Sequence, residues 1–259
     1  MTSPTEATPP GHQYDAVAED YDRLIRPRFD PVAALVVDRV RDLTDVRRAE
    51  VVEISAGTGA LTHQLAPLAA SYVATDISEP MLTVARRYDV PGLARVQWEV
   101  ADMEDLPLQA SSVDVAVSSL GPLLDSERAL AETRRVLRRG GLVAGVTWGD
   151  DYSELACLQE VRRRLGLPLR PTTSPAEVVE RLERAGYRDV VVRGARLPAV
   201  YSSVAAYLSY RQAFGPIPGL TSVTADEMQA TLTECVTEYA DQRGQVVLDW
   251  QLCVFSGQT

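Results

Sequence analysis

The stretch Val51-Val52-Glu53-Ile54-Ser55-Ala56-Gly57-Thr58-Gly59-Ala60 decides the fold that we predict for this chain. It begins as a short apolar run and ends in small residues, and leucines at helical spacing follow it (Leu61, Leu65 and Leu68). This pattern predicts a buried parallel strand, a tight loop and the start of a helix. Because Gly57 and Gly59 carry no Cβ, a ligand can approach the loop backbone closely. The free N–H groups of the following helix favour an anionic or strongly polar ligand.

Two further predicted strands are followed by acidic residues. Residues 71–75 lead to Asp76, and residues 94–100 are followed closely by Asp102. Glu53 lies near the end of the first strand, where a purely structural core would favour an apolar side chain. The carboxyl ends of parallel strands meet at one edge of a sheet, and open α/β sheets bind ligands at that edge. The sequence therefore predicts a polar ligand site lined by several carboxylates.

Binding of a nicotinamide dinucleotide is the nearest alternative. Its fingerprint is G-x-G-x-x-G, with an acidic residue about 20 positions further on. Asp76 satisfies the second condition, but Thr62 occupies the position of the third glycine. This alternative also leaves Glu53 and Asp102 without a role.

Taken together, these segments resemble the class I S-adenosylmethionine (SAM) methyltransferases, and most of all their small-molecule, type 11-like members. The matching segments are 53–59, 76–82, 101–107, 113–119 and 136–142, together with a Tyr-Asp element at 14–22. The resemblance runs from about residue 14 to the end of the sequence and is weakest between residues 199 and 244. One departure is Ser55, which stands where the family usually has glycine and whose hydroxyl could reach the cofactor.

The resemblance implies SAM as cofactor and S-adenosylhomocysteine as product. In this family Asp76 would bind the ribose diol, Asp102 the adenine amino group, and Glu53 would orient the loop. The implied cofactor-binding residues are Tyr21, Glu53, Ser55, Ala56, Gly57, Thr58, Gly59, Asp76, Ile77, Met81, Asp102, Met103, Ser118 and Ser119. The implied walls of the substrate pocket are Tyr14, Trp148, Tyr152 and Tyr201. No catalytic base is evident, and His12 and Tyr14 are weak candidates; we expect His63 to face solvent.

The fold implied by the resemblance is a Rossmann-like, doubly wound sheet of seven mostly parallel strands with an antiparallel last strand. We expect a disordered leader at 1–13 and a single domain at 14–259. That domain would have an N-terminal helical cover at 14–42 and a helical lid at about 199–244, broken at 215–219. Local signals predict helix starts at Asp30-Pro31 and Asp125, and capping boxes at Ser174 and Thr224.

Composition narrows the class of protein. The chain has 259 residues and a net charge of −10, and all of its Lys and Arg residues are arginine. An acidic surface repels phosphate backbones, which argues against nucleic acid and anionic membranes as partners. No apolar run approaches the ~20 residues of a membrane-spanning helix, so we expect a cytoplasmic protein, monomeric or homodimeric. Three scattered cysteines and two histidines argue for buried thiols and against a metal site.

Three functions remain open from the sequence. The first is transfer of a methyl group from SAM to a small molecule, such as a natural-product or other secondary-metabolism intermediate. The second keeps the fold and SAM but catalyses a non-methylating step such as cyclisation or decarboxylation. The third is a non-catalytic ligand-binding protein, against which Asp76, Asp102 and the glycine loop argue.

Overall fold

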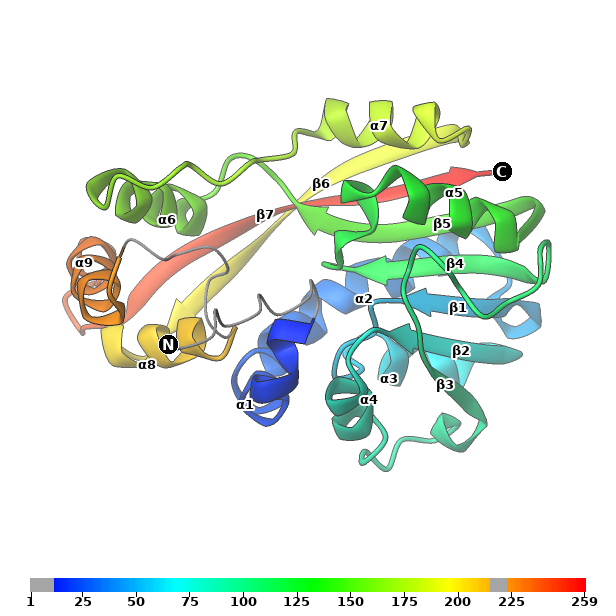
Figure 1. Ribbon diagram of the computed structural model, residues 1–259, viewed down its shortest axis with the longest axis horizontal. Coiled ribbons are helices and arrows are strands. Elements are labelled where there is room, and N and C mark those ends of the chain that lie inside the picture. Colours follow the sequence, from blue (N-terminus) through cyan, green and yellow to red (C-terminus); the bar gives the residue numbers. More distant parts are fainter. Residues whose placement is uncertain (1–11, 215–222) are drawn as a thin grey trace, which may run out of the picture.

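A seven-stranded mixed sheet forms the centre of the computed structural model, which describes residues 12–214 and 223–259 (Figure 1). Its strands are β1 (Glu50–Ile54), β2 (Ser71–Asp76), β3 (Val96–Val100), β4 (Val113–Ser119), β5 (Leu137–Trp148), β6 (Arg188–Tyr201) and β7 (Val246–Gln258). They lie in the order β3-β2-β1-β4-β5-β7-β6. β7 is antiparallel to both β5 and β6, and the other neighbouring strands are parallel. The predicted fold class is therefore confirmed.

Helices cover both faces of this sheet. The α-helices are α1 (Ala18–Leu24), α2 (Arg26–Leu43), α3 (Thr62–Leu65), α4 (Glu79–Ala85), α5 (Glu127–Val136), α6 (Ser153–Arg164), α7 (Pro175–Arg184), α8 (Val204–Gln212) and α9 (Ala225–Thr237). Alternate residues of β4 separate the two layers: Val115 packs in one cluster with Val36 of α2, and Ala116 in another with Leu130 of α5. This alternation explains why the central strands read as continuous apolar runs.

The strand order reverses at β1, which has β2 on one side and β4 on the other. The loop after β1 therefore emerges at the topological switch point, with the carboxyl ends of β2 and β4 beside it. A crevice suited to a ligand is expected at this place in an open α/β sheet. The site predicted from Gly57 and Asp76 thus lies where the topology favours binding.

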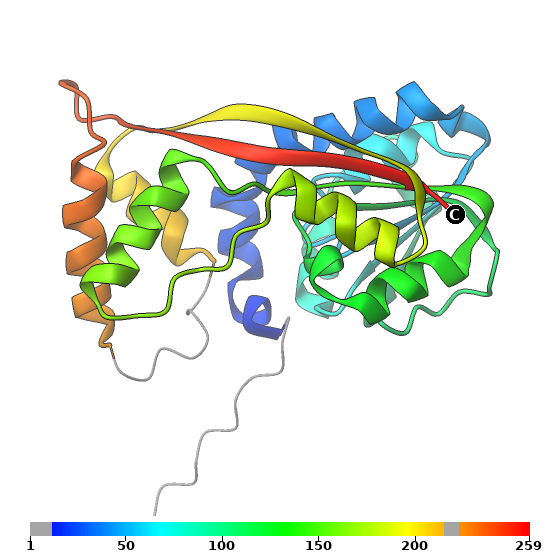
Figure 2. The same cartoon turned by 90° about the horizontal axis from the view of Figure 1, so that it is seen from above.

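A group of helices lies beyond the carboxyl edge of the sheet. In both views α1 stands between the sheet and the helices α6, α8 and α9, and the parallel strands point toward it (Figures 1 and 2). The long strands β6 and β7 reach past the other strands to this group. α9 packs against both α6 and α8. The carboxyl edge is thus covered by segments that are far apart in the sequence.

Several predicted boundaries need correction. Asp30 and Pro31 do not start a helix, because α2 begins at Arg26 and contains Pro31. α5 is capped by Ser126, whose hydroxyl accepts from the Ala129 N–H, rather than by Asp125. The capping boxes at Ser174 and Thr224 are confirmed.

Part of the predicted N-terminal and lid boundaries falls outside the described residues. Residues 1–11 of the expected leader and the break at 215–219 lie there. His12 and Gln13, which we expected in the leader, begin the 3₁₀ helix η1 (His12–Val17). η1 and α1 both pack against α4, so the N-terminal cover lies over the β2 side of the site. None of the described helices is long and apolar enough to cross a bilayer.

Candidate active site

Glu53 is a buried carboxyl group at the end of β1. Its side chain accepts hydrogen bonds from the hydroxyls of Thr62, at 2.5 Å, and Tyr72, at 2.7 Å. Burial raises the pKa of Glu53 to about 7, although both hydroxyl groups favour the charged form. Glu53 therefore ties β1, β2 and the start of α3 together behind the loop.

The pKa of Glu53 predicts a specific dependence of stability on pH. Below pH 4.5, the ordinary pKa of a glutamate, the Glu53 carboxyl is neutral in both the folded and the unfolded protein. Between pH 4.5 and about 7 it has lost its proton in the unfolded protein only. The free energy of unfolding therefore falls as pH rises through this window, by about 1.4 kcal/mol per unit, and levels off above it. The Gln side chain of Glu53→Gln can still accept both hydroxyl hydrogen bonds but does not titrate. We therefore expect the variant's free energy of unfolding to fall by about 2 kcal/mol less than that of the wild type between pH 5.5 and 8.

Urea unfolding of the wild type and of Glu53→Gln at both pH values measures this difference. The comparison cancels the contribution of the other titrating groups because they are common to both proteins. Equal pH dependence of the two proteins would contradict the prediction.

Asp76 joins the end of β2 to the glycine loop. Its Oδ2 accepts from the Gly57 N–H at 2.8 Å, and its Oδ1 accepts from the Ser78 N–H at 2.9 Å. Burial raises the pKa of Asp76, and these backbone N–H groups partly counter that rise. Each oxygen can still accept another hydrogen bond, so the carboxylate can hold a diol without releasing the loop.

Asp102 lies next to Asp76 but in a wetter environment. The N–H of Ala101 donates to the backbone oxygen of Asp76 at 3.0 Å, which brings the end of β3 to the same edge. Asp102 is exposed, and its Oδ1 accepts from the N–H of Glu104 at 2.9 Å. Met103 is half-buried against the apolar cluster that contains Ile54. The structure thus brings the ends of β2 and β3, which carry the two predicted acids, to the same edge of the sheet.

Ser55 has the backbone conformation that glycine adopts most easily, in line with the glycine that the resembled family usually has at this position. Ser55 has φ 60°, a left-handed conformation that favours glycine, and Leu120 after β4 has φ 57°. Such positions cost about 1–2 kcal/mol for a residue with a side chain. A Cβ on Gly121 would lie 2.7 Å from the Ser55 Cβ and 2.9 Å from the Ser118 Oγ. Strained residues of two strand ends therefore meet here, as is common at functional sites.

Buried polar atoms without partners lie around this edge. Among the described residues, Ser118 Oγ at the end of β4 and Asp15 Oδ1 of η1 are buried and make no hydrogen bond. Such atoms are rare in folded proteins and point to a missing ligand or water. Asp15 is close enough that its charge raises the pKa of Asp76, after the larger effect of burial. Asp15 was not among the predicted site residues, although the Tyr-Asp element contains it.

The remaining predicted cofactor residues lie on both sides of the loop. Tyr21 contacts Tyr14 edge to face at 5.8 Å between ring centroids. Met81, one turn into α4, is buried and packs with Ala18, beside both tyrosines. The other predicted residues are Ala56 and Thr58, which are buried, and Ile77 and Ser119, which are half-buried.

Aromatic side chains form a continuous cluster beyond the end of β5. Trp148 stacks on Tyr152 at 5.7 Å and contacts Phe29 of α2 at 6.0 Å, so these two predicted pocket walls lie together. Phe29 also contacts Tyr21 at 6.2 Å, which links the cluster to the cofactor side. Tyr152 and Tyr201 are both buried, at 8% and 0% exposure, whereas Trp148 is half-buried and offers more surface than either.

A buried ion pair that sequence reasoning missed lies under this cluster. Glu154 of α6 accepts from the Tyr207 hydroxyl at 3.3 Å and from the Trp250 Nε1–H. The Arg211 Nη1 of α8 lies 3.6 Å from Glu154 Oε1. These residues are up to 96 positions apart, so no local pattern could reveal them.

The two histidines occupy contrasting environments. His63 is buried and not solvent-facing as expected: Arg26 donates to its Nδ1 and its Nε2 lies 2.9 Å from the Ala85 carbonyl oxygen. Burial lowers the pKa of His63 to about 4. His12 is half-buried, and its Nδ1 lies 3.0 Å from Asp15 Oδ2. The two nitrogens of His63 are therefore both in use, whereas in the described part of the chain His12 Nε2 has no partner.

The two glycines of the loop make a matched test. Both have positive φ, but a Cβ on Gly59 would lie 2.8 Å from the fixed ring of His63, whereas a Cβ on Gly57 meets nothing within 4 Å. We expect Gly59→Ala to lower the free energy of unfolding by about 3 kcal/mol and Gly57→Ala by about 1 kcal/mol. Urea unfolding measures both values, and equal losses would contradict the assignment.

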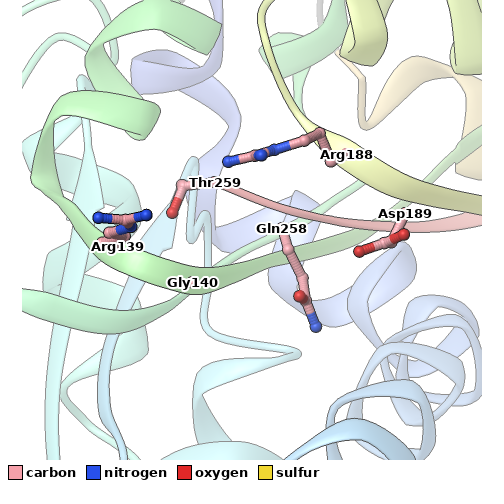
Figure 3. A pocket seen from close by; sticks show the side chains of 6 residues that line it. All are labelled: Arg139, Gly140, Arg188, Asp189, Gln258 and Thr259. Atoms are coloured by element: carbon pink, nitrogen blue, oxygen red, sulfur yellow. The ribbon is translucent and has the colours of Figure 1, made fainter.

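Two shallow hollows lie at the opposite, amino-terminal edge of the parallel strands. One of them has a volume of about 510 Å³, and its lining residues are Arg139, Gly140, Arg188, Asp189, Gln258 and Thr259 (Figure 3). The predicted site residues are not among them. All three cysteines are buried, as predicted.

Comparison with known proteins adds to this geometry. A family model described as a methyltransferase domain matches residues 51–141. The chain is 34% identical over 191 residues to the malonyl-[acyl-carrier protein] O-methyltransferase of Geobacter sulfurreducens, with 68% of each protein covered. It is 33% identical over 135 residues to the demethylmenaquinone methyltransferase of Clavibacter sepedonicus, covering 50% of this chain and 54% of that protein. The chain thus spans 54% of the length of the Clavibacter protein, and 60% of the length of an uncharacterized Mycobacterium bovis protein that it also matches.

A solved structure supports the same fold. A putative methyltransferase from Bacillus halodurans superposes with a TM-score of 0.60 at 16% identity, covering 88% of this chain and 97% of that one. At this identity the likeness concerns the fold alone.

Proposed function

Because the chain belongs to the class I SAM-dependent methyltransferase family, we propose that it transfers a methyl group from SAM to a small-molecule acceptor. The observation that carries the proposal is the hydrogen bond of 2.8 Å from the Gly57 N–H to Asp76 Oδ2. Gly57 itself faces open space, because a Cβ at this position would meet no atom within 4 Å. Such a loop lets a ligand meet the backbone, while the carboxylate remains able to accept from a diol.

The residues at this edge fit SAM. Asp76 would hold the ribose hydroxyls, Asp102 and the Met103 N–H would bind the adenine, and the unpartnered Ser118 Oγ would face the methionine end. Glu53 would fix the loop from behind rather than touch the ligand. When bound, SAM supplies a methyl group on a positively charged sulfur that departs as a neutral thioether. The other implied contacts, from Ser55 to Gly59 and from Tyr21, Ile77, Met81 and Ser119, belong to the same proposal.

We assign to His12 the removal of the proton from a hydroxyl group of the acceptor. Asp15 Oδ2 lies 3.0 Å from His12 Nδ1, which favours the tautomer with the proton on Nδ1 and leaves the Nε2 lone pair free. An acceptor hydroxyl would pass its proton to Nε2 as its oxygen bonds to the methyl carbon. Tyr14 is a weaker candidate, because burial raises the pKa of its hydroxyl.

Calorimetry with SAM, S-adenosylhomocysteine and NAD tests the cofactor. We expect the first two to bind and NAD not to bind; the reverse would overturn the proposal. Mass spectrometry of incubations with candidate acceptors then tests the reaction. Methyl transfer requires one S-adenosylhomocysteine per methylated product, whereas a cyclisation or decarboxylation assisted by SAM leaves SAM intact.

The His12 assignment has its own test. The chain has two histidines, so ¹⁵N-detected NMR resolves both imidazoles. We expect His12 as the tautomer protonated at Nδ1, and Asp15→Asn to abolish that preference without changing His63. A His12 protonated at Nε2 in the wild type would rule out this role.

The identity of the acceptor and the cellular setting are also part of the proposal. According to their names, one relative acts on malonyl-[acyl-carrier protein] and another on demethylmenaquinone. Family membership therefore leaves the acceptor open. We favour a natural-product or other secondary-metabolism intermediate, with the aromatic cluster of Trp148 and Tyr152 as the acceptor pocket. We also propose a cytoplasmic protein, monomeric or homodimeric, and the net charge of −10 argues against nucleic acid and anionic membranes as partners.

A further inference from the structure

Two arginines act on the same pair of tyrosine hydroxyls. Burial raises the pKa of Tyr14, and a hydrogen bond with Gln13 and then the charges of Arg170 and Arg211 counter that rise. Burial raises the pKa of Tyr152 to about 12, and the same two arginines again counter it. Tyr14 lies on η1, and Tyr152 lies between β5 and α6. Contacts place Arg211 near the N-terminal cover as well, because its guanidinium lies 4.8 Å from the Phe214 ring centroid, and Phe214 contacts Tyr21 of that cover at 5.9 Å.

Ionic and ring contacts, rather than hydrogen bonds to the described residues, hold Arg211 in place. Its Nη1 lies 3.6 Å from Glu154, and its guanidinium lies 4.8 Å from the ring centroid of Phe214. The hydrogen bonds that Glu154 accepts come from Tyr207 and Trp250. Toward the described residues, Arg211 donates no hydrogen bond. A mostly buried guanidinium whose N–H groups donate to none of the described residues is suited to bind an oxyanion.

Arg170 supplies a second guanidinium from the connection between α6 and α7. Gln159 holds its backbone from both sides, accepting from the Arg170 N–H and donating to its carbonyl oxygen, each at 2.9 Å. Its side chain is exposed and has no partner in the described ranges. By contrast, Arg28 is committed to structure, because it donates to Val200 and lies over the ring of Tyr201 at 3.9 Å.

The charges on the two sides of Tyr14 have opposite signs. Asp76 on the cofactor side raises the pKa of Tyr14, while Arg170 and Arg211 lower it. Beside these groups the half-buried ring of Trp148 stacks on the buried ring of Tyr152. A molecule lying along Trp148 would place a negative group at the arginines and its other end toward the acidic cofactor side.

We propose that the acceptor carries an oxyanion group, a carboxylate or a phosphate, bound by Arg211 and Arg170 while its apolar body packs on Trp148 and Tyr152. The planar guanidinium binds either oxyanion through two parallel hydrogen bonds. Anchoring the charged end at α8 directs the opposite end of the acceptor toward Tyr14 and His12. This inference rests on the proposed function, because it assigns the acceptor end of the same site.

Matched probes test the proposal directly. Calorimetry on the full chain, with and without saturating S-adenosylhomocysteine, compares 4-hydroxybenzoate with 4-hydroxybenzamide, and phenyl phosphate with phenol. We expect at least one acid to bind about tenfold or more tightly than its uncharged partner, since charge-assisted bonds are the stronger ones. The two pairs distinguish a carboxylate site from a phosphate site. Equal affinities within both pairs, or no binding of either acid, would overturn the inference.

Three substitutions locate the binding group. Arg170→Gln, at an exposed position, should weaken the favoured acid about fivefold and leave the uncharged probe unchanged. Arg211→Gln should do the same, and Glu154→Gln/Arg211→Gln repeats the test without the unpaired carboxylate. Arg188→Gln, in the hollow at the opposite edge, is the control with the same charge change (Figure 3). Unchanged acid binding in the Arg170 and Arg211 variants would refute the assignment.

The same titrations separate the two proposals. If S-adenosylhomocysteine binds and the acids show no preference over their uncharged partners, the inference fails and the proposed function stands. If the acids bind through the arginines but S-adenosylhomocysteine does not, the anion site stands and the proposed methyl transfer fails.

Discussion

Asp76→Ala is expected to weaken the binding of S-adenosylhomocysteine by between tenfold and about 100-fold. The carboxylate would accept charge-assisted hydrogen bonds from the ribose, and such bonds contribute about 1.5–3 kcal/mol. The substitution also leaves the Gly57 N–H without its present partner, which loosens the loop at the point of contact. Calorimetry measures the dissociation constant, and thermal unfolding without ligand measures the loss of loop stability separately.

Asp102→Ala provides the control for this prediction. Asp102 is exposed and already bonded within its own turn, so water screens its contribution more strongly. We expect its loss to weaken binding less than about fivefold. If Asp76→Ala bound the ligand as tightly as the wild type, the proposed cofactor site would be refuted.

Arg211→Met is expected to lower the free energy of unfolding by about 3 kcal/mol, because it leaves the Glu154 carboxylate buried without its countercharge. The hydrogen bonds from Tyr207 and Trp250 remain but cannot neutralise that charge. The double variant Glu154→Gln/Arg211→Met removes both charges and should recover most of the loss. Buried ion pairs commonly behave in this way, because breaking one is costly and replacing both partners is nearly neutral.

Urea unfolding of the two single variants and the double variant completes the cycle. A coupling energy of at least about 1 kcal/mol is expected for groups in direct contact. Additive effects would mean that Arg211 and Glu154 do not interact energetically, whatever their separation of 3.6 Å.

The central strands and the glycine loop could be predicted because their signals are local. The apolar run before Gly57 and the acid after residues 71–75 each specify an element without reference to the rest of the chain. Parallel strands then bring their carboxyl ends to one edge for topological reasons. Asp76 therefore lies beside the loop, as its position in the sequence indicated.

The helix start at Asp30-Pro31 was mispredicted because a local signal was overridden by packing. Ile25 and Phe29 are buried at helical spacing before the proline, so the helix begins earlier. Proline lacks one backbone donor, and the burial of this face evidently outweighs that loss. Counting the apolar period back from Val32 would have found the true start.

The charged centre of the helical cover could not be predicted from any local pattern. Glu154, Arg211 and Trp250 lie on α6, α8 and β7, and only the complete fold brings them together. His63 illustrates the same limit, because its burial depends on Arg26 and Ala85 from other elements. Side chains whose partners are distant in sequence need the coordinates.

The place of β7 in the sheet has a consequence for how the chain is made. Residues 246–258 fill the gap between β5 and β6, so until this segment has been made β5 is paired only with β4, and β6 lacks its partner strand. Until then the edges of β5 and β6 present unpaired backbone groups that can recruit another chain. Closure of the sheet is therefore non-local, and any condition that slows the insertion of β7 favours association between chains over completion of the sheet.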